Sequence, residues 1–320
     1  MRPMIKYRGG KTREIPHIME FVPRFSGRYV EPFFGGGALY FYLEPRKAVI
    51  NDVNAKLMGF YRGVRDDFQN LRGELDELER LYDGYRNEFE ALKLQCPDQR
   101  VEDKNEALYY SLRDMFNGKV AKAYSDALLY YYINKASYSG MIRYNAQGEF
   151  NVPYGRYKHL NTKSVTLLHS KLLQRSELLN EDYSVVFDMC KIDDFVFLDP
   201  PYDCVFSDYG NVEYRGGFDE ECHKKLAKDF ANLPCKALMV IGRTPLTEEL
   251  YKDYIVGEYD KNYAVNIRNR FKSAAQHIVV ANYRMAWANE RVVSAPTLYP
   301  EVENYQLRLF EASEPYGTNK

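Results

Sequence analysis

The sequence lacks the patterns that mark a secreted, membrane-spanning or disulfide-stabilised chain. Its first residues, MRPMIKYRGGK, contain no apolar h-region, and no apolar run approaches the ~20 residues of a membrane span. The five cysteines form no CxxC pair and have no histidine pattern beside them. We therefore expect reduced thiols, no metal site, no membrane contact and a cytoplasmic location.

Net charge is also nearly absent, at −1 over 320 residues, but its distribution is uneven. Between Lys135 and Arg175 seven basic residues accompany one acid, Glu149, so this window carries +6 and the rest of the chain −7. A second window, residues 261–289, contains no acid at all. Two basic windows on a near-neutral chain predict local contact with a polyanion, although a solvated basic surface would show the same composition.

The order of the apolar segments predicts an α/β fold. RYVEPF and KAVIND read as short strands around a helix of about ten residues, as in a βαβ unit with a parallel sheet. After residue 161 the same alternation returns. There the strands are predicted at SELLNED, DFVFLDP, KALMVIG, YIVGEY and HIVVANY.

Between these two parts the pattern becomes helical. From residue 71 to 92 apolar residues recur every three or four positions, which predicts a helix that Gly73 and Gly84 weaken and that ends before Pro97. Two more helices are expected before residues 137–157, where NAQG predicts a hairpin with glycine at positive φ. We thus expect an α/β domain of residues 1–57 and 161–290, an insertion at 58–160, and a tail at 291–320.

Polar and glycine-rich motifs follow three of the predicted strands. EPFFGGG ends one strand, NDVN with Asp52 ends the next, and DPPY at 199–202 ends a third. The carboxyl ends of parallel strands share one edge, where ligands of open α/β sheets bind. That edge would offer glycine backbone to a carboxylate or phosphate, an acid to a ribose and an aromatic platform to a planar ring. A nicotinamide cofactor would suit the first two features, and DPPY alone would suit an ordinary turn.

These pieces together resemble the Dam-like (class alpha) family of DNA adenine-N6 methyltransferases, which use S-adenosylmethionine. The matching segments are KYRGGK at 6–11, VEPFFGGG at 30–37, NDVN at 51–54, the block SYSGMIRYNAQGEFNVPYGRY at 137–157, EDY at 181–183, DPPY at 199–202 and VVANY at 279–283. They occur in the family's order over roughly residues 6–283. Arg8 and the helical insertion depart from the family's pattern, which leaves the recognised DNA sequence open.

The resemblance implies a Rossmann-like S-adenosylmethionine-dependent sheet with helices on both faces and an inserted, mostly helical DNA-recognition domain. It implies catalysis by Asp199, Pro200, Pro201 and Tyr202. Asp199 and the Pro200 carbonyl would accept the N6 hydrogens of a flipped adenine, and Tyr202 would stack on the base.

The cofactor site that the resemblance implies comprises Tyr7, Lys11, Glu31, Phe33, Gly35, Gly37, Asp52, Val53, Asp182, Tyr183 and Asp199. Within it, Lys11 would meet the methionine carboxylate and Asp52 would accept from the ribose. Phe33 and Val53 would enclose the adenine, and Asp182 with Tyr183 would border its edge.

The DNA-binding residues implied by the resemblance and the basic windows are Lys135, Tyr138, Ser139, Arg143, Asn145, Asn151, Pro153, Arg156, Lys158, Arg268 and Arg270. Tyr138, expected at a strand start, would wedge into the opened base stack. Arg143 would read guanine in the major groove. Without the resemblance, a packed tyrosine and a surface charge would explain both residues.

The expected partners are double-stranded DNA, with a GATC-like site as the default, and a cognate restriction endonuclease acting on the same site. We expect a monomer or weak dimer. The alternatives are methylation of RNA or of a protein amide, a nucleotide-dependent oxidoreductase, and a DNA-binding regulator without activity. Asp as the first residue of DPPY, the absence of GxGxxG spacing and the intact tetrad favour the DNA methyltransferase.

Overall fold

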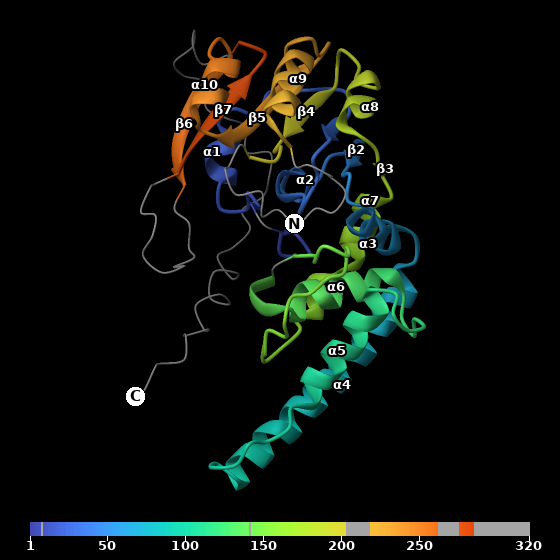
Figure 1. Cartoon of the computed structure of the whole chain (residues 1–320). Helices are drawn as coiled ribbons and strands as arrows, with labels where there is room; N and C mark the ends of the chain where they lie inside the picture. Colours follow the sequence, from blue (N-terminus) through green and yellow to red (C-terminus); the bar gives the residue numbers. More distant parts are fainter. Residues whose placement is uncertain (8, 141, 203–217, 262–274, 285–320) are drawn as a thin grey trace. The chain divides into compact units, whose positions relative to one another are not determined.

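Seven apolar segments of the described chain form one mixed β-sheet (Figure 1). The computed structural model describes residues 1–7, 9–140, 142–202, 218–261 and 275–284. The strands are β1 (Tyr29–Glu31), β2 (Ala48–Asn51), β3 (Ser176–Leu179), β4 (Phe195–Leu198), β5 (Lys236–Gly242), β6 (Ile255–Lys261) and β7 (Ala275–Ala281). Their order is β3-β2-β1-β4-β5-β7-β6, and β7 runs antiparallel to both of its neighbours. Every residue of β1, β2 and β4 is buried, as in parallel strands covered on both faces.

Helices connect the consecutive strands from β1 to β6 in the predicted alternation. In the described chain they are α1 (Ile15–Met19), α2 (Ala38–Leu43), α3 (Ala55–Asp66), α4 (Phe68–Gln95), α5 (Lys104–Phe116), α6 (Asp126–Ala136), α7 (Leu167–Leu173), α8 (Tyr183–Asp188), α9 (Glu220–Ala231) and α10 (Pro245–Tyr251). Each of the seven strands predicted for the α/β part coincides with an observed one. The mixed α/β architecture is consistent with the fold of an S-adenosylmethionine-dependent methyltransferase.

The long helix α4 continues through both glycines that weakened its prediction. Its buried face is Leu71, Leu75, Leu78 and Tyr82, whereas Gly73 and Gly84 are exposed. A glycine in a helix costs about 1 kcal/mol, but each buried leucine contributes about 1.5–3 kcal/mol. Packing of this face against α5 and α6 therefore outweighs the two glycines, and the helix ends at Gln95, two residues before Pro97.

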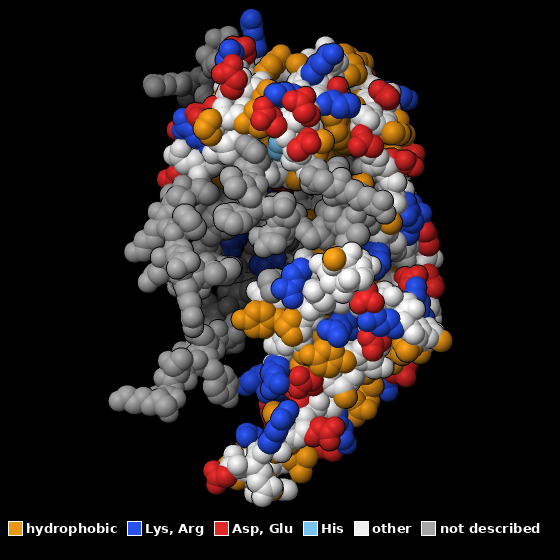
Figure 2. All heavy atoms as spheres, viewed as in Figure 1, with side chains coloured by type: hydrophobic (Ala, Val, Ile, Leu, Met, Phe, Trp, Pro, Cys, Tyr) orange, Lys and Arg blue, Asp and Glu red, His pale blue; other side chains and the backbone are white. Residues whose placement is uncertain are grey.

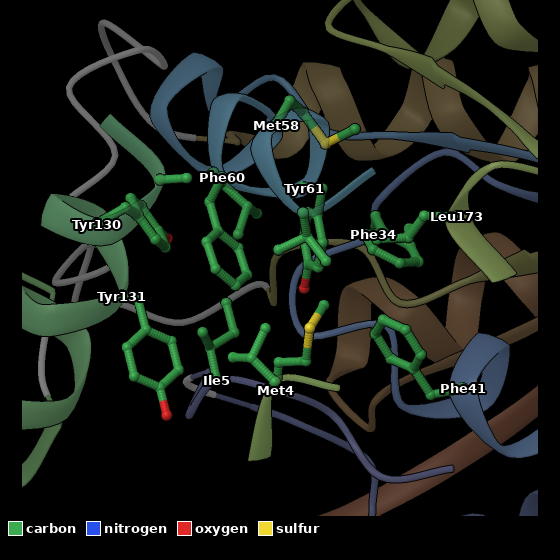
Figure 3. Close-up of a cluster of buried hydrophobic side chains, with 14 of the residues drawn as sticks. Met4, Ile5, Phe34, Phe41, Met58, Phe60, Tyr61, Tyr130, Tyr131 and Leu173 are labelled. Carbon is green, nitrogen blue, oxygen red and sulfur yellow. The ribbon is translucent and has the colours of Figure 1, made fainter. Parts of the chain in front are cut away.

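Helix α3 joins the sheet to the helical segment. It packs against α7 and β3 as well as α6, so the expected boundary at residue 58 lies inside this helix. Figure 3 shows Phe60 and Tyr61 of α3 between Tyr130 of α6 and Phe34 of the glycine-rich turn. These rings are buried in one core cluster, and Met1–Arg284 form a single compact unit. The position of the glycine-rich turn thus depends on aromatic packing against the helical segment.

Residues 137–157 fold back on themselves with less regular pairing than the predicted hairpin. Two isolated antiparallel bridges, Ser137 with Tyr154 and Tyr144 with Phe150, replace continuous strands. Gly148 adopts the expected positive φ, at 77°. The prediction that Tyr138 begins a strand is wrong, because Tyr138–Gly140 form a short 3-10 turn after α6.

Candidate active site

The glycine-rich turn after β1 requires glycine for its backbone and for its packing. Gly35 and Gly37 have φ values of 47° and 63°, in the left-handed region. A Cβ at Gly35 would lie 2.8 Å from the ring of Tyr7, and one at Gly37 would lie 2.4 Å from the ring of Phe34. The side chain against Gly35 is therefore Tyr7 of the KYRGGK segment, so two of the predicted cofactor residues are in contact.

Asp52 holds this turn in place. Its Oδ2 accepts from the Gly35 N–H at 2.8 Å, and its Oδ1 accepts from the Asn54 N–H at 2.9 Å. Burial raises the pKa of Asp52 to about 6, although both backbone hydrogen bonds lower it. Tyr61 of α3 donates to the Gly35 carbonyl at 2.9 Å. Both oxygens that were expected to meet a ribose thus already accept from backbone amides.

Two asparagines that the sequence analysis missed tie the strand ends together. Asn51 is buried; its Nδ2 donates to the carbonyls of Pro32 and Glu181, and its Oδ1 accepts from the Glu181 N–H. Asn180 donates to the carbonyls of Asp52 and Val53. The signal in the sequence was a polar residue at the end of an apolar strand. These bonds fix the edge formed by the carboxyl ends of β1, β2 and β3.

Lys11 contacts the DPPY loop. Its Nζ lies 2.5 Å from Asp199 Oδ1 and 2.5 Å from the hydroxyl of Tyr202. Lys11 is 2% exposed and the Asp199 side chain 22%, so the ion pair is largely screened from water. Pro200 is buried and Pro201 half-buried. The structure therefore brings Lys11, Asp199 and Tyr202 together, with the Lys11 ammonium against the DPPY loop.

Glu31 adds a third acid to this edge. It is buried at the end of β1 and accepts from the Tyr29 hydroxyl at 2.8 Å. Burial raises its pKa well above the ordinary value, and the negative charges of Asp199 and Asp52 add to that rise. The rise favours a protonated Glu31.

Aromatic rings border the same edge near β2 and α8. The half-buried Phe33 ring lies 5.4 Å from the Tyr183 ring, and the Tyr183 hydroxyl donates to Asp229 at 2.9 Å. Val53 is half-buried. The exposed Asp182 is the N-cap of α8, where its Oδ1 accepts from Ser184. Phe33 and Tyr183 are therefore together, while Asp182 has a local structural contact.

Tyr138 and Ser139 form the turn after α6. Tyr138 is 58% exposed, and its N–H donates to the carbonyl of Pro153 at 2.8 Å. Ser139 has a left-handed φ of 58°, which is uncommon for a residue with a Cβ. A large exposed ring on a turn fixed at its backbone is suited to contact a planar partner.

The remaining described residues of the expected DNA-binding set differ in their surroundings. Arg143 is exposed and donates from Nε to Asn151 Oδ1 at 2.9 Å, whereas Asn145 accepts from backbone amides inside its own turn. Lys158 is exposed. Arg156 pairs with Glu106 at 3.1 Å.

Lys135 differs from these cations because it is largely buried. Burial, followed by repulsion from Lys6, lowers its pKa to about 8. Figure 2 shows Lys and Arg side chains beside acidic ones on the helical part of the face in view. Arg268 and Arg270 lie outside the described residues.

In the described ranges no helix is long and apolar enough to cross a membrane. Within the same ranges no three His, Cys, Asp or Glu side chains are grouped so that they could hold a metal ion.

Comparison with known proteins relates the chain to DNA adenine methylation. Residues 7–267 match the family described as D12 class N6 adenine-specific DNA methyltransferase. The type II methyltransferase M.CviBI of Paramecium bursaria Chlorella virus NC1A is 32% identical over 290 residues, which cover 88% of this chain and 100% of that protein. The type II methyltransferase M1.LlaDCHI of Lactococcus lactis subsp. cremoris is 30% identical over 88% of this chain and 96% of its own length. A DNA adenine methylase of Haemophilus influenzae is 25% identical over 78% of this chain and 82% of its own length. With its DPPY loop, glycine-rich turn and matched length, the chain belongs to the family of D12 class N6 adenine-specific DNA methyltransferases.

Proposed function

We propose that this DNA adenine methyltransferase takes its methyl group from S-adenosylmethionine and transfers it to N6 of an adenine flipped out of double-stranded DNA. The observation that carries the proposal is the contact of Lys11 with both Asp199 and Tyr202 at the carboxyl end of β4. That contact joins the DPPY loop to the segment that also packs on the glycine-rich turn.

The residues at this edge fit the proposed cofactor in their chemistry. The half-buried Phe33 and Val53 offer apolar surface to an adenine, and Asp182 and Tyr183 lie at the start of the adjoining helix. The turn at Gly35 and Gly37, which Tyr7 covers, would hold the methionine part. Asp52 would act by holding this turn in place. Glu31, buried at the end of β1, would lie on the side of the turn away from the cofactor. When bound, S-adenosylmethionine supplies an electrophilic sulfonium methyl.

Asp199 carries the chemistry in this proposal. Adenine N6 is a poor nucleophile because its lone pair is delocalised into the ring. A carboxylate that accepts one N6 hydrogen and the Pro200 carbonyl that accepts the other direct that lone pair at the methyl group and stabilise the positive charge that develops on nitrogen. Lys11 engages Oδ1, which leaves Oδ2 for the base.

Tyr202 is the proposed stacking platform, and Pro201 stiffens the loop that carries it. A paired adenine cannot reach such a pocket, so the base must leave the helix. The exposed ring of Tyr138 would fill the vacated stack. Both side chains interact with a base through its π face, which makes these contacts tolerant of sequence.

We further propose that residues 58–160 carry target recognition. Arg143, which Asn151 orients, would read guanine, and the exposed Lys158 would contact phosphate. The other proposed DNA contacts are Lys135, Ser139, Asn145, Pro153, Arg156, Arg268 and Arg270. A GATC-like site, a companion restriction endonuclease, a monomer or weak dimer and a cytoplasmic location complete the proposal. The names of the type II relatives support the endonuclease.

Single-turnover transfer from tritiated S-adenosylmethionine to an adenine-containing duplex tests the catalytic role. Asp199→Asn should transfer at least ~10²-fold more slowly, because one preorganised charge is lost. Cofactor and DNA binding, measured by calorimetry, should survive, since most contacts lie elsewhere. Transfer at the wild-type rate, or label on cytosine, would contradict the assignment.

A further inference from the structure

A buried polar cluster lies behind the DPPY loop. Oε2 of Glu14 accepts from the Tyr259 hydroxyl at 2.6 Å and lies 2.7 Å from His277 Nδ1. Glu14 is 7% exposed and His277 is fully buried. Glu14 precedes α1, while Tyr259 and His277 are paired residues of β6 and β7. One carboxylate thus joins the N-terminal segment to two antiparallel strands that are more than 240 residues away.

His277 contacts the proposed stacking platform directly. Its ring centroid lies 5.3 Å from that of Tyr202, at an interplanar angle of 69°, which is an edge-to-face contact. On the neighbouring strand, a Cβ at Gly242 would lie 3.9 Å from the same ring. Tyr202 therefore packs over the ends of β5 and β7, with the imidazole as its polar neighbour.

Glu14 also fixes the second contact to Tyr202. The Glu14 N–H donates to the Lys11 carbonyl at 2.8 Å, so these two residues belong to one turn. The Lys11 ammonium contacts the Tyr202 hydroxyl at 2.5 Å and lies 5.0 Å from the ring centroid. Glu14 consequently acts on Tyr202 by two routes, through His277 on the ring and through Lys11 on the hydroxyl.

Stability alone does not account for this cluster. Burying a carboxylate and an imidazole costs free energy that apolar side chains of similar volume would not cost. What the polar cluster provides is direction, because hydrogen bonds of fixed geometry set the angle of the imidazole and the path of the Lys11 turn.

We propose that Glu14 and His277 are positioning residues for methyl transfer, which set the orientation of the Tyr202 ring and, through Lys11, that of Asp199 toward the target base. This inference rests on the proposed roles of Tyr202 and Asp199. Tyr259 supports the same arrangement by holding the Glu14 carboxylate.

Three conservative variants test the proposal, and Glu14→Ala adds the complete loss of the Glu14 side chain. His277→Phe keeps a ring beside Tyr202 but removes the bond to Glu14, Glu14→Gln keeps an acceptor without charge, and Tyr259→Phe removes one hydroxyl. The matched control is His169→Gln. His169 is also a buried histidine. It lies in α7, and its ring nitrogens are hydrogen-bonded to Thr166 and to the carbonyl of Arg2.

The readouts are the single-turnover rate, the dissociation constants and the fluorescence of 2-aminopurine placed at the target adenine. The duplex carries the site that methylation-sensitive sequencing of expressing cells identifies.

We expect His277→Phe to slow transfer by ~10- to 100-fold, because misplacement of a reacting group by about 1 Å has effects of that size. Cofactor and DNA dissociation constants should stay within about twofold, and fluorescence should rise as stacking loosens. Glu14→Gln should lose less than Glu14→Ala, and His169→Gln should leave rate and fluorescence unchanged.

Parallel measurement of Asp199→Asn separates the two proposals. If Asp199→Asn is active, the proposed catalytic role fails. If it is inactive while His277→Phe and Glu14→Gln show wild-type rates and fluorescence, the positioning role is refuted. A loss of rate that only follows the loss of folded protein also refutes it. If His277→Phe does not fold, the Tyr259→Phe variant tests the positioning role instead. A wild-type transfer rate and wild-type fluorescence in Tyr259→Phe would then overturn the inference.

Discussion

The ion pair between Lys11 and Asp199 should show strong energetic coupling in a double-mutant cycle. The two residues are 188 positions apart, yet Nζ and Oδ1 are 2.5 Å apart. Lys11→Met keeps the apolar stem and removes the charge, while Asp199→Asn keeps the shape of the carboxylate. The double variant has neither charge.

The expected magnitude follows from distance and burial. At 2.5 Å and an effective dielectric constant of about 20, the direct attraction is roughly 7 kcal/mol, which desolvation of the buried ammonium partly offsets. Removing one partner of a buried pair costs about 3–5 kcal/mol. Because Asp199 retains 22% exposure and hence some hydration, we expect about 3 kcal/mol for Lys11→Met. The double variant should be at least ~1 kcal/mol more stable than the sum of the single changes implies.

Urea unfolding of the four proteins, followed by circular dichroism, measures this coupling. Arg28 and Asp194 offer a matched control, because this pair has similar burial but lies just before β1 and β4, whereas Asp199 follows β4. Arg28→Met combined with Asp199→Asn should be additive within about 0.5 kcal/mol, as expected for separated sites. If the effects of Lys11→Met and Asp199→Asn on the free energy of unfolding also add within about 0.5 kcal/mol, the reasoning is refuted.

Three further predictions concern recognition, the glycines and pH. Arg143→Ala should cost ~1–3 kcal/mol at one guanine and relax specificity there, measured on a library of single-base substitutions, whereas Lys158→Ala should weaken binding to all sites alike. Gly37→Ala should destabilise by at least ~1–2 kcal/mol, because φ is 63° and the new Cβ would meet a ring at 2.4 Å. Gly73→Ala, with open space in a helix, should stabilise by ~0.5–1 kcal/mol, and urea unfolding measures both glycine variants. Burial raises the pKa of Asp52 from 3.8 to about 6, so its stabilising contribution is complete below pH 3.8 and lost as pH rises to about 6. Between pH 4 and pH 7 this linkage should lower the free energy of unfolding by about 2 kcal/mol, and Asp52→Asn should abolish that decrease.

Local sequence was sufficient for the elements and for the motifs they carry. Short segments bounded by polar or turn residues gave the seven strands of the sheet, most clearly β1, β2 and β4, because a buried parallel strand needs apolar side chains on both faces. The glycine-rich turn was likewise predictable, since left-handed backbone at Gly35 and Gly37 strongly favours glycine. Segment order and motif identity also gave the family, which the match over residues 7–267 confirms.

Local propensity misled where packing decided the outcome. Gly73 and Gly84 suggested a weakened helix, but the buried leucines of α4 outweigh them. Tyr138 follows Ser137, whose extended backbone ends α6, and it begins a 3-10 turn in which the Pro153 carbonyl fixes its amide. A pattern of alternating residues contains no information about that distant acceptor.

Only the tertiary structure determined which motifs touch. Strand β4 pairs with β1 although two strands intervene in sequence, and this order carries Asp199 to Lys11 and the glycine-rich turn. The bond between Glu14 and His277 spans 263 positions and depends on β7 entering antiparallel beside β5. Sequence specifies such contacts only through the packing of the whole sheet, because a side chain's partner across 200 residues depends on strand order and register. The residues of the candidate active site could therefore be predicted from local motifs, while the contacts between them were determined by the fold.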